Sequence, residues 1–171
     1  VPITDLAQWH SDLKTLGFTE RVEELESIFG GPPGPENQAE YRKRSPLGHL
    51  RSLKRTPVLI AAGVKDGHKG GTVPVRHALL AFNELAAANE TNELVFSEEE
   101  IRAISEAASV PSHLILKDEE PLPLGRSLVL KRQAGLTTLW LSDGGHEDDP
   151  EASVRWFEEH SGGVTSSTKA P

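Results

Sequence analysis

Residues 57–67 read Pro57-Val58-Leu59-Ile60-Ala61-Ala62-Gly63-Val64-Lys65-Asp66-Gly67, an apolar run that ends in a glycine turn carrying an acid. An apolar run of this length is typical of a parallel strand that is buried on both faces. A second run, residues 137–141, leads in the same way into Gly144-Gly145-His146. Because reactive groups collect beyond the carboxyl ends of parallel strands, we expect Asp66 and His146 to meet at one edge of a sheet.

Apolar residues at helical spacing surround these two runs. After the glycine-rich turn at 67–71, the pattern predicts a long helix capped by Thr72, so that strand, turn and helix form one β-α unit. Ser97 followed by Glu100 is a capping box that starts another helix. We expect further helices at 5–16, at 19–29, and at the C-terminal end, where the helix begins at Asp148 or Asp149 and buries Val154, Trp156 or Phe157. The fold class is therefore expected to be α/β with a mostly parallel sheet.

The length of 171 residues suits one domain with a sizeable core. We expect this domain to span residues 1–160, with a lid-like insertion at about 89–127, where several prolines limit regular structure. The tail at 161–171 is rich in Ser, Gly and Thr, which is typical of a disordered segment. Residues 128–130 form an apolar run too short to assign.

The composition excludes several classes of function. With 26 acidic and 18 basic residues, the net charge of −8 disfavours a nucleic-acid partner, and we interpret the basic cluster at 42–44 as a solvated helix face. No apolar run approaches the roughly 20 residues that span a bilayer, so we expect no membrane partner. The absence of cysteine excludes disulfides, thiolate metal ligands and a cysteine nucleophile. The chain also has no methionine, and we interpret Val1 as a boundary within a longer protein.

Asp66 and His146 are the residues whose chemistry points to a reaction. An acid at a strand end can accept the Nδ1 proton of a histidine and stabilise the imidazolium that forms when Nε2 takes a proton from a nucleophile. Each residue also has an ordinary interpretation, since Asp-Gly is common in turns and a histidine between glycine and glutamate is usually exposed. Their joint placement after two buried strands favours the catalytic interpretation. No serine before Asp66 lies in a G-x-S-x-G setting that would complete the set.

Other candidates are weaker. His68 lies two residues after Asp66 and is a candidate substrate-binding residue, although a histidine on a glycine-rich loop is often solvated. Asp143 competes with Asp66 as the orienting acid, but we place it in the turn before His146. No metal site is predicted, because residues 146–149 lack a second histidine at helical spacing; a metal-dependent hydrolase that uses Asp66, His68 and His146 stays open. We interpret the remaining histidines as structural or exposed: His10, His49, His77, His113 and His160.

With these residues in view, the chain resembles the C-terminal part of the prolyl-oligopeptidase-like branch of the α/β-hydrolases, which contains serine peptidases and esterases. The resemblance covers most of residues 1–160. It rests on Val1-Pro2-Ile3-Thr4-Asp5, Tyr41-Arg42-Lys43-Arg44-Ser45-Pro46-Leu47, the run from Pro57 to Asp66, Val73-Pro74-Val75, Ala81-Phe82-Asn83-Glu84-Leu85 and Gly144-Gly145-His146.

The resemblance implies the C-terminal half of a three-layer αβα sandwich that cleaves an ester or peptide through an acyl-enzyme, without a cofactor. By position, Asp66 is the triad acid and His146 the general base, while the serine and oxyanion hole lie before Val1 on an N-terminal segment or chain of the same hydrolase. The chain departs from the family pattern in its longer loop after Asp66 and in lacking the nucleophile. The alternative is a non-catalytic α/β interaction module or a degenerate hydrolase.

Overall fold

The computed structural model describes residues 2–68, 70–116, 120–122, 126–147 and 149–160. Its helices are α1 (Leu6–Leu16), α2 (Thr19–Phe29), α3 (Gln38–Arg44), α4 (Arg76–Ala88), α5 (Glu98–Ala107) and α6 (Pro150–His160), with 3₁₀ segments η1 (Pro46–Leu53) and η2 (Asn92–Leu94). The strands are β1 (Val58–Gly63), β2 (Glu120–Leu122), β3 (Arg126–Ala134) and β4 (Thr137–Ser142).

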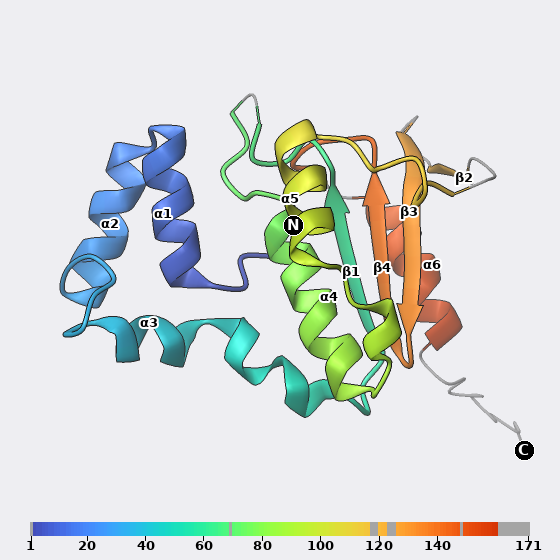
Figure 1. Cartoon of the computed structure of the whole chain (residues 1–171), viewed down its shortest axis with the longest axis horizontal. Helices are drawn as coiled ribbons and strands as arrows, with labels where there is room; N and C mark the ends of the chain where they lie inside the picture. Colours follow the sequence, from blue (N-terminus) through green and yellow to red (C-terminus); the bar gives the residue numbers. More distant parts are fainter. Residues whose placement is uncertain (1, 69, 117–119, 123–125, 148, 161–171) are drawn as a thin grey trace, which may run out of the picture.

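The four strands form one mixed sheet in the order β1-β4-β3-β2 (Figure 1). β1 and β4 are parallel, with Ile60 opposite Leu139. The pairs β4·β3 and β3·β2 are both antiparallel. The expectation of a mostly parallel sheet, as in the C-terminal half of an αβα hydrolase sandwich, is therefore wrong, because two of the three strand pairs run in opposite directions.

The sheet departs from the expectation because of β3, which the sequence analysis did not assign. β3 and β4 form a hairpin in which only Gly135 and Leu136 separate Ala134 from Thr137, and Gly135 has a φ of 58°. Two-residue hairpin turns require such positive φ values, which glycine adopts without strain. Only alternate residues of β3, among them Leu128 and Leu130, are fully buried, so its sequence lacks the long apolar run that identified β1 and β4.

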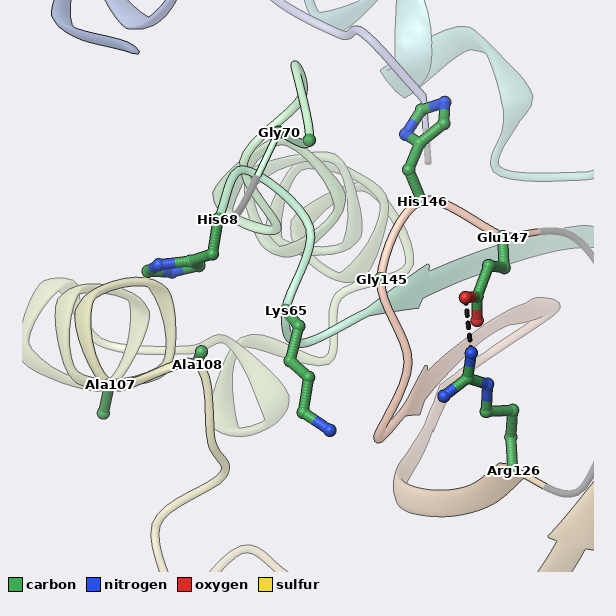
Figure 2. A pocket seen from close by; sticks show the side chains of 10 residues that line it. Lys65, His68, Gly70, Ala107, Ala108, Arg126, Gly145, His146 and Glu147 are labelled. Atoms are coloured by element: carbon green, nitrogen blue, oxygen red, sulfur yellow. Dashed lines mark hydrogen bonds and ion pairs between the residues drawn. The ribbon is translucent and has the colours of Figure 1, made fainter.

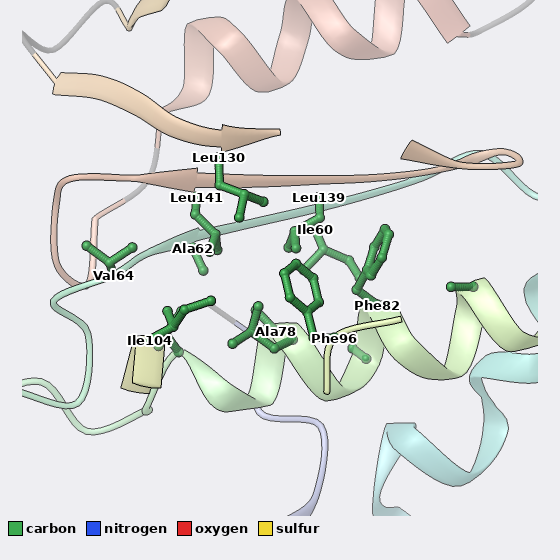
Figure 3. Close-up of a cluster of buried hydrophobic side chains, with 14 of the residues drawn as sticks. Ile60, Ala62, Val64, Ala78, Phe82, Phe96, Ile104, Leu130, Leu139 and Leu141 are labelled. Atoms are coloured by element: carbon green, nitrogen blue, oxygen red, sulfur yellow. The ribbon is translucent and has the colours of Figure 1, made fainter. Parts of the chain in front are cut away.

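The main core lies between the sheet and α4 (Figure 3). The sheet contributes Ile60, Leu139 and Leu141, and α4 contributes Leu79 and Phe82. These side chains are all buried because the predicted apolar stripe of α4 faces two strands that carry large aliphatic residues. This packing holds β1 and β4 in register, and the register determines where the turns after these strands lie.

α6 lies on the opposite face of the sheet from α4 (Figure 3). It begins after Asp149, whose carboxylate accepts a hydrogen bond from the Ala152 amide. Of the three residues expected to face inward, Trp156 is buried, whereas Val154 and Phe157 are 56% and 62% exposed. The helix therefore buries a narrower stripe than its sequence suggested.

The helices α1, α2 and α3 form a separate small cluster beside α4 (Figure 1). Asp5 caps α1 by accepting hydrogen bonds from the Ala7 and Gln8 amides. Several contacts attach this cluster to the sheet domain, including two hydrogen bonds. Trp9 Nε1 donates to the Thr72 carbonyl at 2.8 Å, and the Thr4 hydroxyl donates to the His77 carbonyl at 3.0 Å.

The region expected to form an insertion, about 89–127, contains η2, α5 and β2. α5 begins with the predicted capping box of Ser97 and Glu100. Residues 117–119 and 123–125 of this region, and the whole tail at 161–171, lie outside the described residues. Among the helices that the structure describes, none is long and apolar enough to cross a bilayer.

Candidate catalytic site

Asp66 and His146 meet beyond the carboxyl ends of β1 and β4. His146 Nδ1 lies 2.6 Å from Asp66 Oδ2. The two residues are 80 positions apart in the chain, and the parallel pairing of β1 with β4 brings their turns to the same edge. Asp66 is only 1% exposed, whereas the side chain of His146 is 53% exposed. The site is therefore a buried acid behind an imidazole that solvent can reach.

Backbone hydrogen bonds continue past the two strands and hold these turns together. The Val64 amide donates to the Ser142 carbonyl at 3.0 Å, and the Lys65 amide donates to the Gly144 carbonyl at 2.9 Å. The other carboxylate oxygen of Asp66, Oδ1, accepts a hydrogen bond from the Gly67 amide at 2.8 Å. Both oxygens of Asp66 are thus engaged, which fixes the orientation of the carboxylate toward His146.

The contact with Asp66 assigns the tautomer of His146. A carboxylate accepts hydrogen bonds, so Nδ1 carries the proton that it donates to Asp66 Oδ2. In the neutral ring Nε2 is then an acceptor, and no residue in the described ranges forms a hydrogen bond with it. An imidazole held in this way can take a proton at Nε2 and share the resulting positive charge with the acid.

A cavity of about 700 Å³ opens beside His146 (Figure 2). Its walls come from the loop after β1, the end of α5, the start of β3 and the turn after β4. The lining residues are Lys65, His68, Gly70, Gly71, Ala107, Ala108, Arg126, Gly145, His146 and Glu147. A volume in this range is typical of clefts that bind small molecules.

His68 lines this cavity but is not brought to the Asp66–His146 pair. Its Nε2 donates to the Ser105 carbonyl at 2.7 Å, and in Figure 2 its ring points toward α5. The hydrogen bond attaches the loop after β1 to α5, so His68 shapes the wall of the cavity. Contact of His68 with a substrate stays a prediction. Among the described residues, no three His, Asp or Glu side chains come together as metal ligands would.

Two charged residues of the cavity, Lys65 and Arg126, were not predicted from the sequence, and a third, Glu147, was considered only as a possible metal ligand. Lys65 directly precedes Asp66, and its position in the turn after a buried strand was a usable signal. Arg126 and Glu147 form an ion pair across the ends of β3 and β4 (Figure 2). Arg126 lies on the strand that was not assigned, so no local pattern pointed to it.

Asp143, His10 and His113 have partners outside the Asp66–His146 pair. Asp143 Oδ1 accepts a hydrogen bond from the Ser127 amide at 2.9 Å, which ties the turn after β4 to β3. His10 Nε2 lies 2.8 Å from Glu26 Oε1, and His113 lies 3.6 Å from Glu100. His10 and His113 therefore each have an acidic partner.

His77 has a second buried acid as its partner. Its Nε2 lies 3.1 Å from Asp12 Oδ2, and its Nδ1 accepts a hydrogen bond from the Thr4 amide at 3.4 Å. Burial, together with the nearby Arg76 guanidinium, lowers the pKa of His77 to about 4. His77 is thus a neutral, fully buried residue that joins α1 to α4, and it has no exposed nitrogen for chemistry.

Comparison of the chain with protein-family models, with curated proteins and with solved structures found no match.

Proposed function

We propose that this chain supplies the acid and the general base of a serine hydrolase, an esterase or peptidase that acts through an acyl-enzyme. The observation that supports the proposal is the 2.6 Å contact between Asp66 and His146, with the acid buried and Nε2 open. The nucleophilic serine is carried by a segment or chain outside residues 1–171.

The proposed reaction assigns one role to each residue. As the serine oxygen attacks the carbonyl carbon of the substrate, His146 Nε2 takes the hydroxyl proton, and Asp66 stabilises the imidazolium. His146 then gives this proton to the departing alcohol or amine as the bond to the acyl carbon breaks. In the second half, water attacks the acyl-enzyme, His146 takes a proton from the water, and the serine oxygen recovers it as the acid is released.

The course of the N-terminal segment supports entry of the serine from this edge. Thr4 is bonded to His77 at the start of α4, and Trp9 is bonded to Thr72 in the loop that follows Asp66. The N-terminal segment lies near the carboxyl end of β1 in Figure 1 and passes close to His146 in Figure 2. A serine on a segment that precedes Val1 would therefore approach the site without crossing the sheet.

The cavity supports a compact substrate. A space of about 700 Å³ beside His146 has room for a small ester or a short peptide. Peptidase and esterase activity share the same acyl-enzyme chemistry, so both belong to the proposal.

The test is labelling with a fluorophosphonate, which reacts with activated serines, on the protein that includes the preceding segment. We expect one serine outside residues 1–171 to be labelled, and His146→Ala to abolish both labelling and ester turnover. The matched control is His113→Ala, because His113 also has an acidic neighbour but is exposed and is not among the residues that line the cavity. Unchanged ester turnover in His146→Ala would refute the proposal.

The second candidate is a non-catalytic interaction module. The observation that favours it is the lack of a serine in a G-x-S-x-G setting before Asp66. In that case no serine in the complete protein reacts with the fluorophosphonate, and Asp66→Asn and His146→Ala both leave partner binding unchanged.

A further inference from the structure

We propose that the cavity beside His146 binds a carboxylate group of the substrate through Lys65 and Arg126. This inference rests on the proposed function and adds to it the class of substrate: an ester or peptide that carries a negative charge close to the bond that is cleaved.

The charges that line the cavity are the first argument. Lys65, Arg126, His68 and His146 are basic, and Glu147 is the only acid among the lining residues that the structure describes. Glu147 already forms an ion pair with Arg126. Lys65 forms no ion pair with any residue in the part of the chain that the structure describes. Among the described lining residues, the Lys65 ammonium therefore has no compensating carboxylate.

The positions of the two cations are the second argument. In Figure 2 the turn that carries Gly145 passes between Lys65 and Arg126, and both of these residues line the cavity. Arg126 uses one terminal nitrogen for Glu147. A guanidinium has five N–H donors, so further donors stay available to a ligand. An anion bound in the cavity would therefore have one cation available on each side of this turn.

The Lys65 ammonium, which has no ion-pair partner among the described residues, selects the type of anion. The chain as a whole has a net charge of −8, so this ammonium differs in sign from the net charge of the chain. Such a cation attracts an anion locally while the remaining surface repels it. A single ammonium matches a carboxylate, which is singly charged, better than the doubly charged phosphate of a monoester.

The test compares two probes that differ only in charge. Monomethyl glutarate contains an ester and a carboxylate, and methyl glutaramate replaces the carboxylate with a neutral amide of similar shape. Each is titrated into the ¹⁵N-labelled chain, and the backbone amide signals of Lys65, Gly145 and His146 are followed by NMR. We expect the carboxylate probe to shift these signals at several-fold lower concentration than the amide probe.

Charge variants of the lining test the residues themselves. Lys65→Met keeps the length of the side chain and removes its charge, and we expect about three- to five-fold weaker binding of monomethyl glutarate, in line with a partly exposed ion pair. Glu147→Gln frees Arg126 from its counter-charge and is expected to strengthen binding by a similar factor. Lys43→Met, an exposed lysine of α3, is the matched control and should change nothing.

Equal binding of the two probes, or an unchanged affinity in both Lys65→Met and Glu147→Gln, overturns the carboxylate site. Tighter binding of inorganic phosphate than of monomethyl glutarate overturns the assignment to a carboxylate. The readout is binding to the chain and needs no serine. A carboxylate preference without fluorophosphonate labelling of the complete protein would therefore contradict the proposed reaction alone, and labelling without a carboxylate preference would contradict this inference alone.

Discussion

Gly63 at the end of β1 lies directly against Gly145 in the turn after β4. A Cβ atom added to Gly63 would lie 2.3 Å from the Gly145 carbonyl oxygen and 2.4 Å from the Gly144 carbonyl oxygen. No side chain fits in that space, because real Cβ contacts are not this short. The absence of a side chain at Gly63 is what allows the two turns to approach closely enough for His146 to reach Asp66.

We therefore expect Gly63→Ala to separate the two turns. Overpacking of this kind costs about 1–3 kcal/mol of unfolding free energy, which urea denaturation measures. The His146 ring signals in NMR should move as well, because the contact with Asp66 lengthens. Gly48→Ala is the control, since nothing lies within 4 Å of a Cβ at Gly48. Equal stability of the two variants would show that the turns are not held in contact.

Asp66→Asn is expected to reverse the tautomer of His146. The amide group of the new asparagine can donate to Nδ1, which leaves the proton on Nε2 and removes the acceptor that a nucleophile needs. The ¹⁵N shifts of the two ring nitrogens should exchange their character. In the complete protein, ester turnover should fall about 10³- to 10⁴-fold.

The matched control for this change is Asp143→Asn, three residues before His146. Its carboxylate oxygen Oδ1 accepts a hydrogen bond from the Ser127 amide, and an asparagine side chain can accept the same bond. Both the tautomer of His146 and the ester turnover should be retained. Loss of turnover in Asp143→Asn but not in Asp66→Asn would assign the acid role to Asp143.

His77 predicts a loss of stability in mild acid. Its pKa is lowered to about 4 in the folded protein by burial and by Arg76, from an ordinary value near 6.5. Between these two values the unfolded chain binds a proton that the folded chain does not, so stability is complete above about pH 6.5 and falls as the pH drops toward 4. The loss attributable to this residue is about 3 kcal/mol.

Urea denaturation between pH 4.5 and pH 7 measures this dependence. We expect His77→Gln to show a smaller loss over that range than the original chain, whereas His113→Gln, whose histidine is exposed, should show the same loss as the original chain. An NMR titration of the unmodified chain gives a direct check. A His77 ring that titrates near pH 6.5 in the folded protein would contradict the prediction.

Ala108, which lines the cavity at the end of α5, has a positive φ of 50°. This left-handed conformation strains an alanine, whereas glycine adopts it freely. Ala108→Gly is therefore expected to stabilise the protein by about 0.5–1 kcal/mol after the added flexibility of the unfolded chain is subtracted. Ala107→Gly, one residue earlier and inside the helix, should destabilise it by about 1 kcal/mol. The opposite signs in thermal unfolding are the diagnostic result.

Much of the local structure could be predicted from sequence. The strands β1 and β4, the helix α1 and the Ser97–Glu100 capping box were all expected. Each of these features depends on residues that are close together in the chain: an apolar run, or a side chain next to free backbone amides. The placement of Asp66 and His146 after the two strands follows from the same local patterns, although their catalytic role stays a prediction.

The strand directions, the cavity and the buried polar pairs came only from the folded chain. Nothing near Arg126 indicates that it belongs to an antiparallel strand, and nothing near His77 points to Asp12, 65 residues away. Such contacts pair individual residues of distant segments. A single pair of this kind leaves no periodic pattern in either segment. Local sequence thus accounts for the two turns that carry Asp66 and His146, whereas the pairing of β1 with β4 and the close approach at Gly63 bring those turns within hydrogen-bonding distance.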